Sequence, residues 1–376
     1  MKEGISTQVR PQTLDELVGM DHNVNIIKYE IGGSQALGEP LNSYMLVGPP
    51  GTGKSTIATL ISSMTKRPNG MNSEVHKYLG SDIKEPDDLY DIARNAEDGD
   101  VVYVEEAHSI GGGGRKKSEV QAILLEWIEN HQILNGASFG LINAPKVCFL
   151  FPTTNPGRLA SPLRNRCKML HTHFYKLDDM KEIITRALTK VGIDSNQQED
   201  ALTLLAKSSR GTPRTAIMHR IDALRKVMAV DNLSFNLASV DLSLKIHNIN
   251  EWGLEANDIK YCHAIHRIML ESNGRPVGKN TIRNILGIEP DMIDVIEQYL
   301  QQISAIAIDT RGRRLTDFGC RLINVEPIEV SEFVTNIVNP QTRITTEETK
   351  ESILELIQNG CSTMKEIMPQ IGMRYP

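Results

Sequence analysis

Short runs of consecutive apolar residues alternate with amphipathic stretches in the first half of the chain. The runs at residues 43–47 (SYMLV), 100–104 (DVVYV) and 146–151 (KVCFLF) have the length and composition of buried strands. Stretches with helical periodicity, such as residues 118–130, separate them. Buried strands that alternate with helices predict an α/β fold with a doubly wound parallel sheet, up to about residue 176.

The pattern changes twice beyond that point. Residues 178–250 carry apolar positions at i, i+3 and i+4 spacing, which predicts a helical domain. From residue 255 to 323 the order is helix, glycine-containing turn, helix, turn, helix and short strands around residues 310–314, the outline of a winged helix. We therefore predict a parallel-sheet domain, a helical domain, a C-terminal winged helix and a helical extension, over residues 1–176, 177–254, 255–325 and 326–376.

The extension contains a helix start at residues 345–348 (TTEE) and a second helical stretch at 363–371, after Asn359-Gly360. Helix, glycine turn, helix is how a helix-turn-helix begins, but no recognition helix follows. A helical hairpin that docks a partner is an equal alternative, and the sequence leaves both open.

Composition places the chain among globular proteins, with 40% hydrophobic and 23% charged residues. No apolar run approaches the ~20 residues of a membrane helix, and the first residues contain no apolar signal segment. The cysteines lie too far apart for a metal or disulfide pattern, so we expect a reduced, cytoplasmic compartment. The net charge of −6 argues against a DNA-packing role, and any nucleic-acid contact should come from local basic patches.

A glycine-rich loop links the first predicted strand to a helix at residues 56–63. Its sequence fits GxxxxGK[ST] without gaps, in the strand–loop–helix context that the motif requires. Glycines let backbone N–H groups surround phosphates; Lys54 is expected at the β- and γ-phosphates and Ser55 at Mg²⁺. A chance glycine-rich turn is the alternative. The motif predicts ATP and Mg²⁺ binding by Gly48, Pro49, Pro50, Gly51, Thr52, Gly53, Lys54, Ser55 and Thr56.

Two carboxylates follow the second predicted strand, as P-loop hydrolysis requires. Glu106 is the candidate for polarising the attacking water, and Glu105 for organising Mg²⁺. The usual pair is Asp-Glu, so the extra methylene of Glu105 is expected to alter the Mg²⁺ geometry and put efficient hydrolysis in doubt. A solvated charge pair at a strand end is the alternative.

Several motifs together resemble those of the AAA+ ATPases, and most closely the RuvB-like motors that drive branch migration of Holliday junctions. The resemblance extends from Arg10 to about Gly319. It is carried in order by RPQTLDELVG, GPPGTGKST, EEAH, TTNPGRLASPLRNRC, FYKLDDM, RGTPRTA, GRPVGKNTIRNILG and DTRGRRLTDFG. It implies an AAA+ P-loop sheet domain, a helical lid and a C-terminal winged helix.

The resemblance also implies roles for single residues. Thr154 matches the sensor-1 position and Arg214 the sensor-2 arginine of the lid. Arg166 matches the arginine finger, which completes the site of a neighbouring subunit. A ring, by family analogy a hexamer, is therefore expected. A surface salt bridge is the alternative for each arginine. Arg10, Val18 and Tyr175 lie where such proteins enclose the adenosine.

Two basic patches are candidates for DNA contact. The predicted wing carries Arg311, Arg313 and Arg314, with Arg321 close by. The predicted recognition helix, residues 291–301, is acidic and lacks Arg and Lys, so sequence-independent backbone binding is expected. A winged helix that docks protein is the alternative. The second patch follows the glycines at 111–114, in a segment that we expect to be a mobile loop facing the ring pore or, alternatively, a disordered solvated loop: Arg115, Lys116 and Lys117.

Residues 132–145 mark a departure from the family pattern. RuvB-like proteins carry a protruding hairpin here that docks their junction-binding partner RuvA. The segment looks shorter in this chain, so we expect a different adaptor or loading on DNA without one.

The sequence thus predicts an ATP-hydrolysing DNA translocase or helicase of RuvB type, acting in recombination and repair. One alternative is an AAA+ loader or remodeller of a DNA-bound protein, such as a clamp loader. Another is an ATP-gated scaffold that hydrolyses slowly, which the unusual Glu105 motivates.

Overall fold

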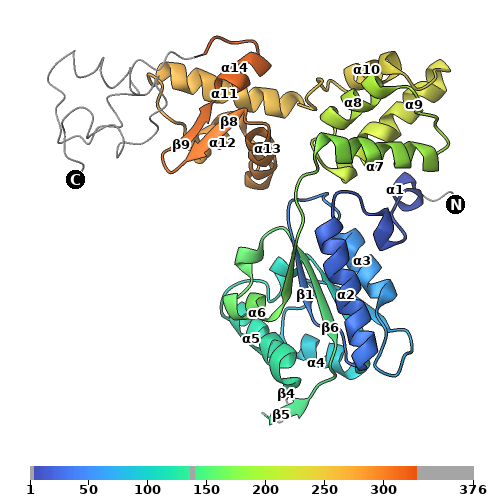
Figure 1. Ribbon diagram of the computed structural model, residues 1–376. Helices are drawn as coiled ribbons and strands as arrows, with labels where there is room; N and C mark the ends of the chain where they lie inside the picture. Colours follow the sequence, from blue (N-terminus) through green and yellow to red (C-terminus); the bar gives the residue numbers. More distant parts are fainter. Residues whose placement is uncertain (1–3, 136–139, 328–376) are drawn as a thin grey trace, which may run out of the picture. The chain divides into compact units, whose positions relative to one another are not determined.

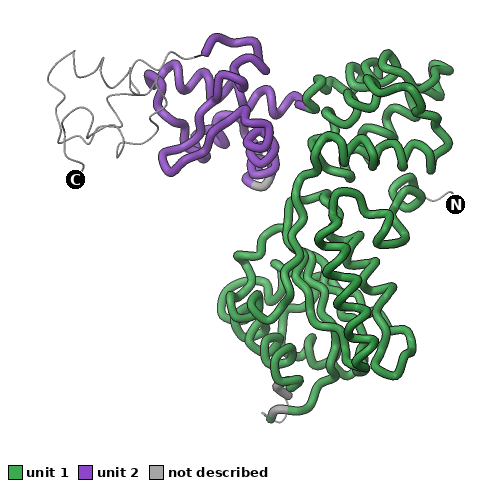
Figure 2. Tube along the Cα trace, in the orientation of Figure 1, with its two compact units in different colours: residues 1–253 green, residues 254–376 purple. Residues whose placement is uncertain are grey.

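The computed structural model describes residues 4–135 and 140–327 (Figure 1). The predicted extension at 326–376 therefore lies almost wholly outside the described residues. The chain divides into two compact units, residues 1–253 and residues 254–376 (Figure 2). Each unit has its own architecture and is described by itself. None of the described helices is long and apolar enough to cross a membrane.

A parallel sheet forms the centre of the first unit, as the apolar runs predict. Its strands lie in the order β2-β3-β6-β1-β7, and every neighbouring pair is parallel. Consecutive buried residues fill β3 and β6 because helices cover both faces. The strands are β1 (Tyr44–Val47), β2 (Val75–Leu79), β3 (Val101–Glu105), β6 (Cys148–Thr153) and β7 (Lys168–His171).

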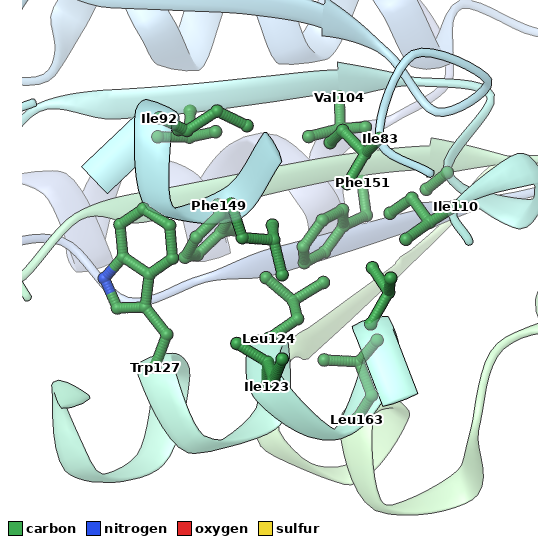
Figure 3. Close-up of a cluster of buried hydrophobic side chains, with 14 of the residues drawn as sticks. Ile83, Ile92, Val104, Ile110, Ile123, Leu124, Trp127, Phe149, Phe151 and Leu163 are labelled. Carbon is green, nitrogen blue, oxygen red and sulfur yellow. The ribbon is translucent and has the colours of Figure 1, made fainter. Parts of the chain in front are cut away.

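Alternate residues of each strand face opposite helical layers. Met45 joins the core beneath α4 (Pro86–Asn95), α5 (Arg115–Asn130) and α6 (Ser161–Arg166), whereas Tyr44 joins the core beneath α2 (Asp21–Leu37) and α3 (Lys54–Met64). Figure 3 shows the first core, where Trp127 meets Phe149 edge to face at 5.0 Å between ring centroids. A hairpin of β4 (Gln132–Asn135) and β5 (Gly140–Asn143) follows α5.

The helical part of this unit has a separate core, to which Val9 of the N-terminal segment contributes. Amphipathic spacing buries Met180, Ile184 and Leu188 along α7. The π-helix η4 leads directly into α9. The elements are α1 (Ile5–Gln8), α7 (Leu177–Lys190), α8 (Glu199–Ser208), η4 (Thr215–Ile221), α9 (Asp222–Asp231) and α10 (Leu237–Ile246), with the 3-10 turns η1 (Leu14–Glu16), η2 (Ala107–Ser109) and η3 (Pro156–Arg158) elsewhere in the unit.

The second unit is a winged helix, as predicted. Its helices precede a two-stranded antiparallel hairpin, to which Val277 adds a bridge opposite Arg313. A short helix that the sequence pattern does not predict ends the described chain. The elements are α11 (Ala256–Glu271), α12 (Lys279–Leu286), α13 (Pro290–Gln302), β8 (Ile306–Asp309), β9 (Gly312–Leu315) and α14 (Asp317–Leu322).

Candidate nucleotide-binding and catalytic site

A cavity of about 500 Å³ lies in the first unit, lined by the N-terminal segment, the glycine-rich loop, the ends of β3 and β6, and the helical part. Most of the predicted nucleotide-binding and catalytic residues line it. Gly48, Pro49, Thr52 and Arg166 do not. The residues that do are Arg10, Val18, Pro50, Gly51, Gly53, Lys54, Ser55, Thr56, Glu105, Glu106, Thr154, Tyr175 and Arg214.

The glycine-rich loop runs from the end of β1 to the first residue of α3. Gly51 and Gly53 have φ angles of 78° and 98°, which residues with a Cβ rarely adopt. A buried hydrogen bond holds the loop in place, with Thr52 Oγ1 2.6 Å from Thr172 Oγ1. The helix N-terminus and the loop amides form the type of concave site that binds phosphates.

Lys54 lies buried at the start of α3, with only 8% of its surface exposed. Its Nζ donates to the carbonyl oxygens of Gly48 at 2.8 Å and Pro49 at 2.6 Å. The pKa of Lys54 is lowered to about 8, chiefly by burial and also by the charge of Arg214, while the charge of Glu105 raises it. The ammonium group is thus held by carbonyl dipoles where a phosphate anion would stabilise it far better.

The first carboxylate of the acidic motif meets the hydroxyl of the glycine-rich loop. Ser55 Oγ donates to Glu105 Oε1 at 2.6 Å, and the Tyr103 hydroxyl donates to Glu105 Oε2 at 2.9 Å. A serine hydroxyl beside a carboxylate is a donor set that suits Mg²⁺, which prefers oxygen ligands. Tyr103 is not among the predicted site residues, although its i, i+2 spacing from Glu105 on a strand places both side chains on one face.

Glu106 presents its side chain to the cavity through an unusual backbone conformation. Its φ and ψ angles, 51° and 48°, are left-handed, so the chain turns sharply after β3 into η2. The turn is held by the Ser109 amide, which donates to the Glu106 carbonyl oxygen at 2.8 Å. A strained residue at a strand end is common at functional sites. The carboxylate is exposed and lines the cavity, as a group that polarises water must.

The end of β6 places two neighbouring threonines differently. Thr153 is buried, accepts from the Asn155 amide at 3.1 Å, and lies 3.3 Å from His108 Nδ1. Thr154 is exposed and lines the cavity. Burial lowers the pKa of His108, with a raising contribution from the charge of Glu106. His108 is not among the predicted site residues, although it lies in the same EEAH motif as Glu105 and Glu106.

The helical part reaches the glycine-rich loop through Arg214. Its amide donates to the Gly51 carbonyl oxygen at 3.4 Å, and a Cβ on Gly51 would lie only 3.0 Å from Arg214 Cβ. Tyr175 closes the same region, since its hydroxyl donates to the Thr52 carbonyl oxygen at 3.4 Å. Arg214, which directly precedes η4, therefore lines the cavity from an element that is not part of the sheet.

Arg166 lies outside this cavity, at the end of α6. Its guanidinium is about half exposed and lies 2.6 Å from Glu129. The hydrogen bond from Arg166 lowers the pKa of Glu129 and, conversely, raises that of the arginine. Arg166 therefore does not line the cavity that the other predicted catalytic residues form in its own chain.

The basic patch at 115–117 is not the predicted loop. Arg115 begins α5, so all three cations lie in the first turn of a helix. Lys116 pairs with Glu85, and Lys117 Nζ donates to the His108 carbonyl oxygen at 3.3 Å. The preceding Gly111 is buried and its amide donates to Ile83, so the expectation of a fully mobile glycine segment is wrong for that residue. A DNA contact by this patch stays a prediction.

The wing of the second unit presents its arginines unequally, which corrects the expectation of three cations on the hairpin tip. Arg313 donates from Nε and Nη2 to the buried Glu297 carboxylate at 2.7 and 2.9 Å. Arg314 is half-buried, 3.8 Å from Asp309. Arg311 is exposed at the turn, where Asp309 Oδ1 accepts from its amide at 2.7 Å. Arg321, on α14, is also exposed.

Comparison with known proteins places both units in one family. A family model described as the Holliday junction DNA helicase RuvB P-loop domain matches residues 9–173, and one described as the RuvB C-terminal winged helix domain matches residues 251–324. The chain is 35% identical over 324 residues to the Holliday junction branch migration complex subunit RuvB of Fervidobacterium nodosum, covering 83% of this chain and 87% of that protein.

Further relatives and solved structures agree. The same subunit from Kosmotoga olearia is 32% identical over 346 residues, covering 86% of this chain and 92% of the relative. The structure of the Thermotoga maritima RuvB Holliday junction branch migration motor aligns with a TM-score of 0.72 at 29% identity, over 85% of this chain and 99% of that one.

Proposed function

The chain belongs to the RuvB family, and on that basis we propose that it is an ATP-driven motor that moves the branch point of Holliday junctions. Members of this family are AAA+ ATPases, and ATP hydrolysis is the activity of this chain. The observation that supports the proposal most directly is the convergence of Lys54, Ser55, Glu105, Glu106 and Arg214 on one cavity.

Each of these residues has a separate task in phosphoryl transfer. The Lys54 ammonium group leaves the loop carbonyl oxygens to which it donates and binds the β- and γ-phosphates instead. Glu106 orients and polarises the attacking water. Mg²⁺ held by Ser55 and Glu105 would neutralise the charge that develops on the phosphates. Thr154 is placed to contact the γ-phosphate or the water, and Arg214 to report the nucleotide state to the helical part. Arg10, Val18 and Tyr175 are placed to enclose the adenosine.

Arg166 is the residue that we propose couples ATP hydrolysis to movement between subunits. Because it lies outside the cavity of its own chain, we propose that it serves the site of a neighbour in a ring, which by family analogy is a hexamer. Hydrolysis would then change the contact between neighbouring subunits, and a motion of the helical part relative to the sheet would move DNA through the ring. The DNA contact is proposed to be largely independent of sequence.

A branch-migration assay on a synthetic four-way junction tests the function. We expect ATP-dependent conversion of the junction to duplex products, and no conversion by the Glu106→Gln variant, which should still bind ATP. DNA-stimulated hydrolysis without strand movement would instead favour a loader or remodeller of a DNA-bound protein. DNA-independent hydrolysis at a rate no faster than that of Glu106→Gln would favour a nucleotide-gated scaffold.

The adaptor is a separate question, for which the β4–β5 hairpin is the relevant feature. Each of its strands has four residues. We propose that so short a hairpin does not dock RuvA and that this protein loads on DNA alone or with another adaptor. Gel filtration of a mixture with RuvA tests this: separate elution is expected, and a stable complex would overturn the proposal.

A further inference from the structure

Both oxygens of the Glu105 carboxylate are occupied by hydroxyl groups of this chain. Oε1 accepts from Ser55 at 2.6 Å, and Oε2 accepts from Tyr103 at 2.9 Å. A glutamate at this position is unusual, because P-loop ATPases commonly carry an aspartate there. Its extra methylene adds a rotatable bond, so an unrestrained glutamate would spread its carboxylate over several rotamers.

Tyr103 is well placed to remove that freedom. It is 3% exposed, and its ring belongs to the core between the sheet and α3, with Ile57 and Ile61. The ring is therefore fixed by packing, and its hydroxyl is fixed with it. Tyr103 and Glu105 lie two residues apart on β3, so their side chains extend from the same face of the strand toward Ser55 on α3.

We propose that Tyr103 is a positioning residue that holds the Glu105 carboxylate against Ser55, so that a glutamate can serve as the Mg²⁺-organising group at this site. The hydroxyl acts as a donor to a charged acceptor, which is the stronger class of hydrogen bond. Tyr103 does not line the cavity, so we assign it no direct contact with nucleotide or metal. The inference rests on the proposed role of Glu105 in Mg²⁺ binding, but not on any action on DNA.

The direction of the hydrogen bond between Tyr103 and Glu105 follows from the two groups. An ionised carboxylate can only accept hydrogen bonds, so the phenolic hydroxyl must be the donor. A hydroxyl that donates to one carboxylate oxygen leaves the other oriented toward Ser55 and the cavity.

The test is a double-mutant cycle that uses Tyr103→Phe, which keeps the packed ring and removes only the hydroxyl, and Glu105→Asp. Binding of a fluorescent ATP analogue is measured against Mg²⁺ concentration, in a Glu106→Gln background so that the nucleotide is not consumed. With Glu105 present, Tyr103→Phe should raise the half-saturating Mg²⁺ concentration about tenfold, the lower end of the range for groups that orient a metal ligand. Nucleotide affinity without Mg²⁺ should be unchanged.

In the Glu105→Asp background the same change should have less than about a twofold effect, because the shorter carboxylate cannot reach Ser55 and Tyr103 together. Equal shifts in both backgrounds would mean that the hydroxyl acts through general packing, and no shift in either would mean that it positions nothing. Either result overturns the proposal. The double variant also guards against misfolding, which would appear in both backgrounds and in the melting temperature.

Tyr44→Phe is a matched control. Tyr44 is 1% exposed and belongs to the same core, on strand β1, which β6 separates from β3 in the sheet. Its hydroxyl has no hydrogen-bond partner among the described residues. Removing this hydroxyl should leave the Mg²⁺ dependence unchanged, and a Mg²⁺ shift as large as that of Tyr103→Phe would contradict the proposal. Because none of these readouts involves DNA, failure of branch migration would leave the inference intact, and its own failure would leave the motor function intact.

Discussion

The guanidinium of Arg166 lies 2.6 Å from the carboxylate of Glu129, outside the cavity that the other predicted catalytic residues line. Both side chains are more than a third exposed, so the pair adds little to stability. An exposed, weakly held arginine is free to exchange this partner for another anion, which in the proposed ring would be a phosphate of the nucleotide bound to a neighbouring subunit. The ion pair therefore holds the Arg166 side chain in place in the isolated chain, but it is weak enough to break when another anion is offered.

Substitution of Arg166 by alanine tests the proposed ring mechanism. We expect steady-state ATP turnover to fall about 10³-fold, the scale of an arginine finger, while nucleotide affinity stays within about twofold. Glu129→Gln is the matched control: it breaks the same pair but leaves the arginine, so turnover should not fall. Mixing Arg166→Ala with Lys54→Ala subunits should restore part of the activity, since some interfaces combine an intact loop with an intact arginine. A mixture with no gain would contradict a shared site.

The lowered pKa of Lys54 predicts a pH dependence of nucleotide binding. In the free protein the pKa is about 8, because the ammonium group is buried. Bound phosphates favour the cation, so the pKa must rise on binding and the protein must take up a proton wherever the pH exceeds about 8. The affinity for nucleotide should therefore weaken as the pH rises above 8. Calorimetry in buffers of different ionisation enthalpy should show proton uptake at pH 9 that disappears in Lys54→Met. Equal uptake in that variant would assign the proton to another group.

The residues whose placement at the cavity could be predicted from the sequence are those that local spacing defines. The loop from Gly48 to Ser55 needs only its strand and helix, and both are encoded next to it. Glu105 and Glu106 follow a run of buried residues that marks the strand end. The local sequence does not show which side chains, far apart along the chain, contact each other in the fold. The contact of Tyr103 with Glu105 depends on the face of β3, and that of Thr153 with His108 on the packing of two loops.

In the wing, too, the sequence does not show which side chains pair with each other. Three arginines on a predicted hairpin suggest a DNA-facing patch, yet Arg313 is bound to Glu297 from α13. A signal was present, because Glu297 lies in the apolar stripe formed by Ile293, Ile296 and Leu300, and a buried carboxylate requires a partner. Composition alone did not show which of the nearby cations would supply it.

Asp100 is predicted to be a structural carboxylate despite its position at the start of a catalytic strand. It is fully buried and accepts from Arg67 Nε at 2.7 Å and from the backbone amides of Glu74 and Glu97 at 2.9 Å. Asp100→Ala should lower the free energy of unfolding by about 3 kcal/mol, because buried donors lose their acceptor. Glu97→Ala, which removes an exposed partner of the same arginine, should cost less than about 0.5 kcal/mol. Urea denaturation measures both.

The same carboxylate predicts a loss of stability in acid. Burial alone would raise the pKa of Asp100, but the hydrogen bonds from Arg67, the backbone amides and His76 outweigh it, and the folded-state pKa lies below the ordinary 3.8. A lowered pKa contributes stability that is complete above the unfolded value and is lost as pH falls through the folded one. The protein should therefore lose stability below about pH 4, and Asp100→Asn should lose less over the same range. Parallel losses would assign the acid sensitivity to other carboxylates.

The wing arginines should separate into one that serves DNA binding and one that serves the fold. Arg311→Ala removes an exposed cation at the turn, so DNA affinity should fall to a similar degree for unrelated sequences, and the slope of log K against log salt should decrease by about one. Arg313→Ala leaves the buried Glu297 without its bidentate partner, which should lower the stability of the winged helix by about 3 kcal/mol.

Arg267→Ala is the control for both measurements. It removes an exposed charge from α11 whose partner is Glu271, one turn away, so stability should change by less than about 0.5 kcal/mol. Its effect on DNA binding should be smaller than that of Arg311→Ala, since it lies on a helix rather than at the hairpin turn. Fluorescence anisotropy on duplexes at several salt concentrations, with thermal unfolding of each variant, distinguishes the outcomes. If Arg311→Ala left the salt slope unchanged while Arg267→Ala reduced it, the DNA would contact α11 instead of the wing.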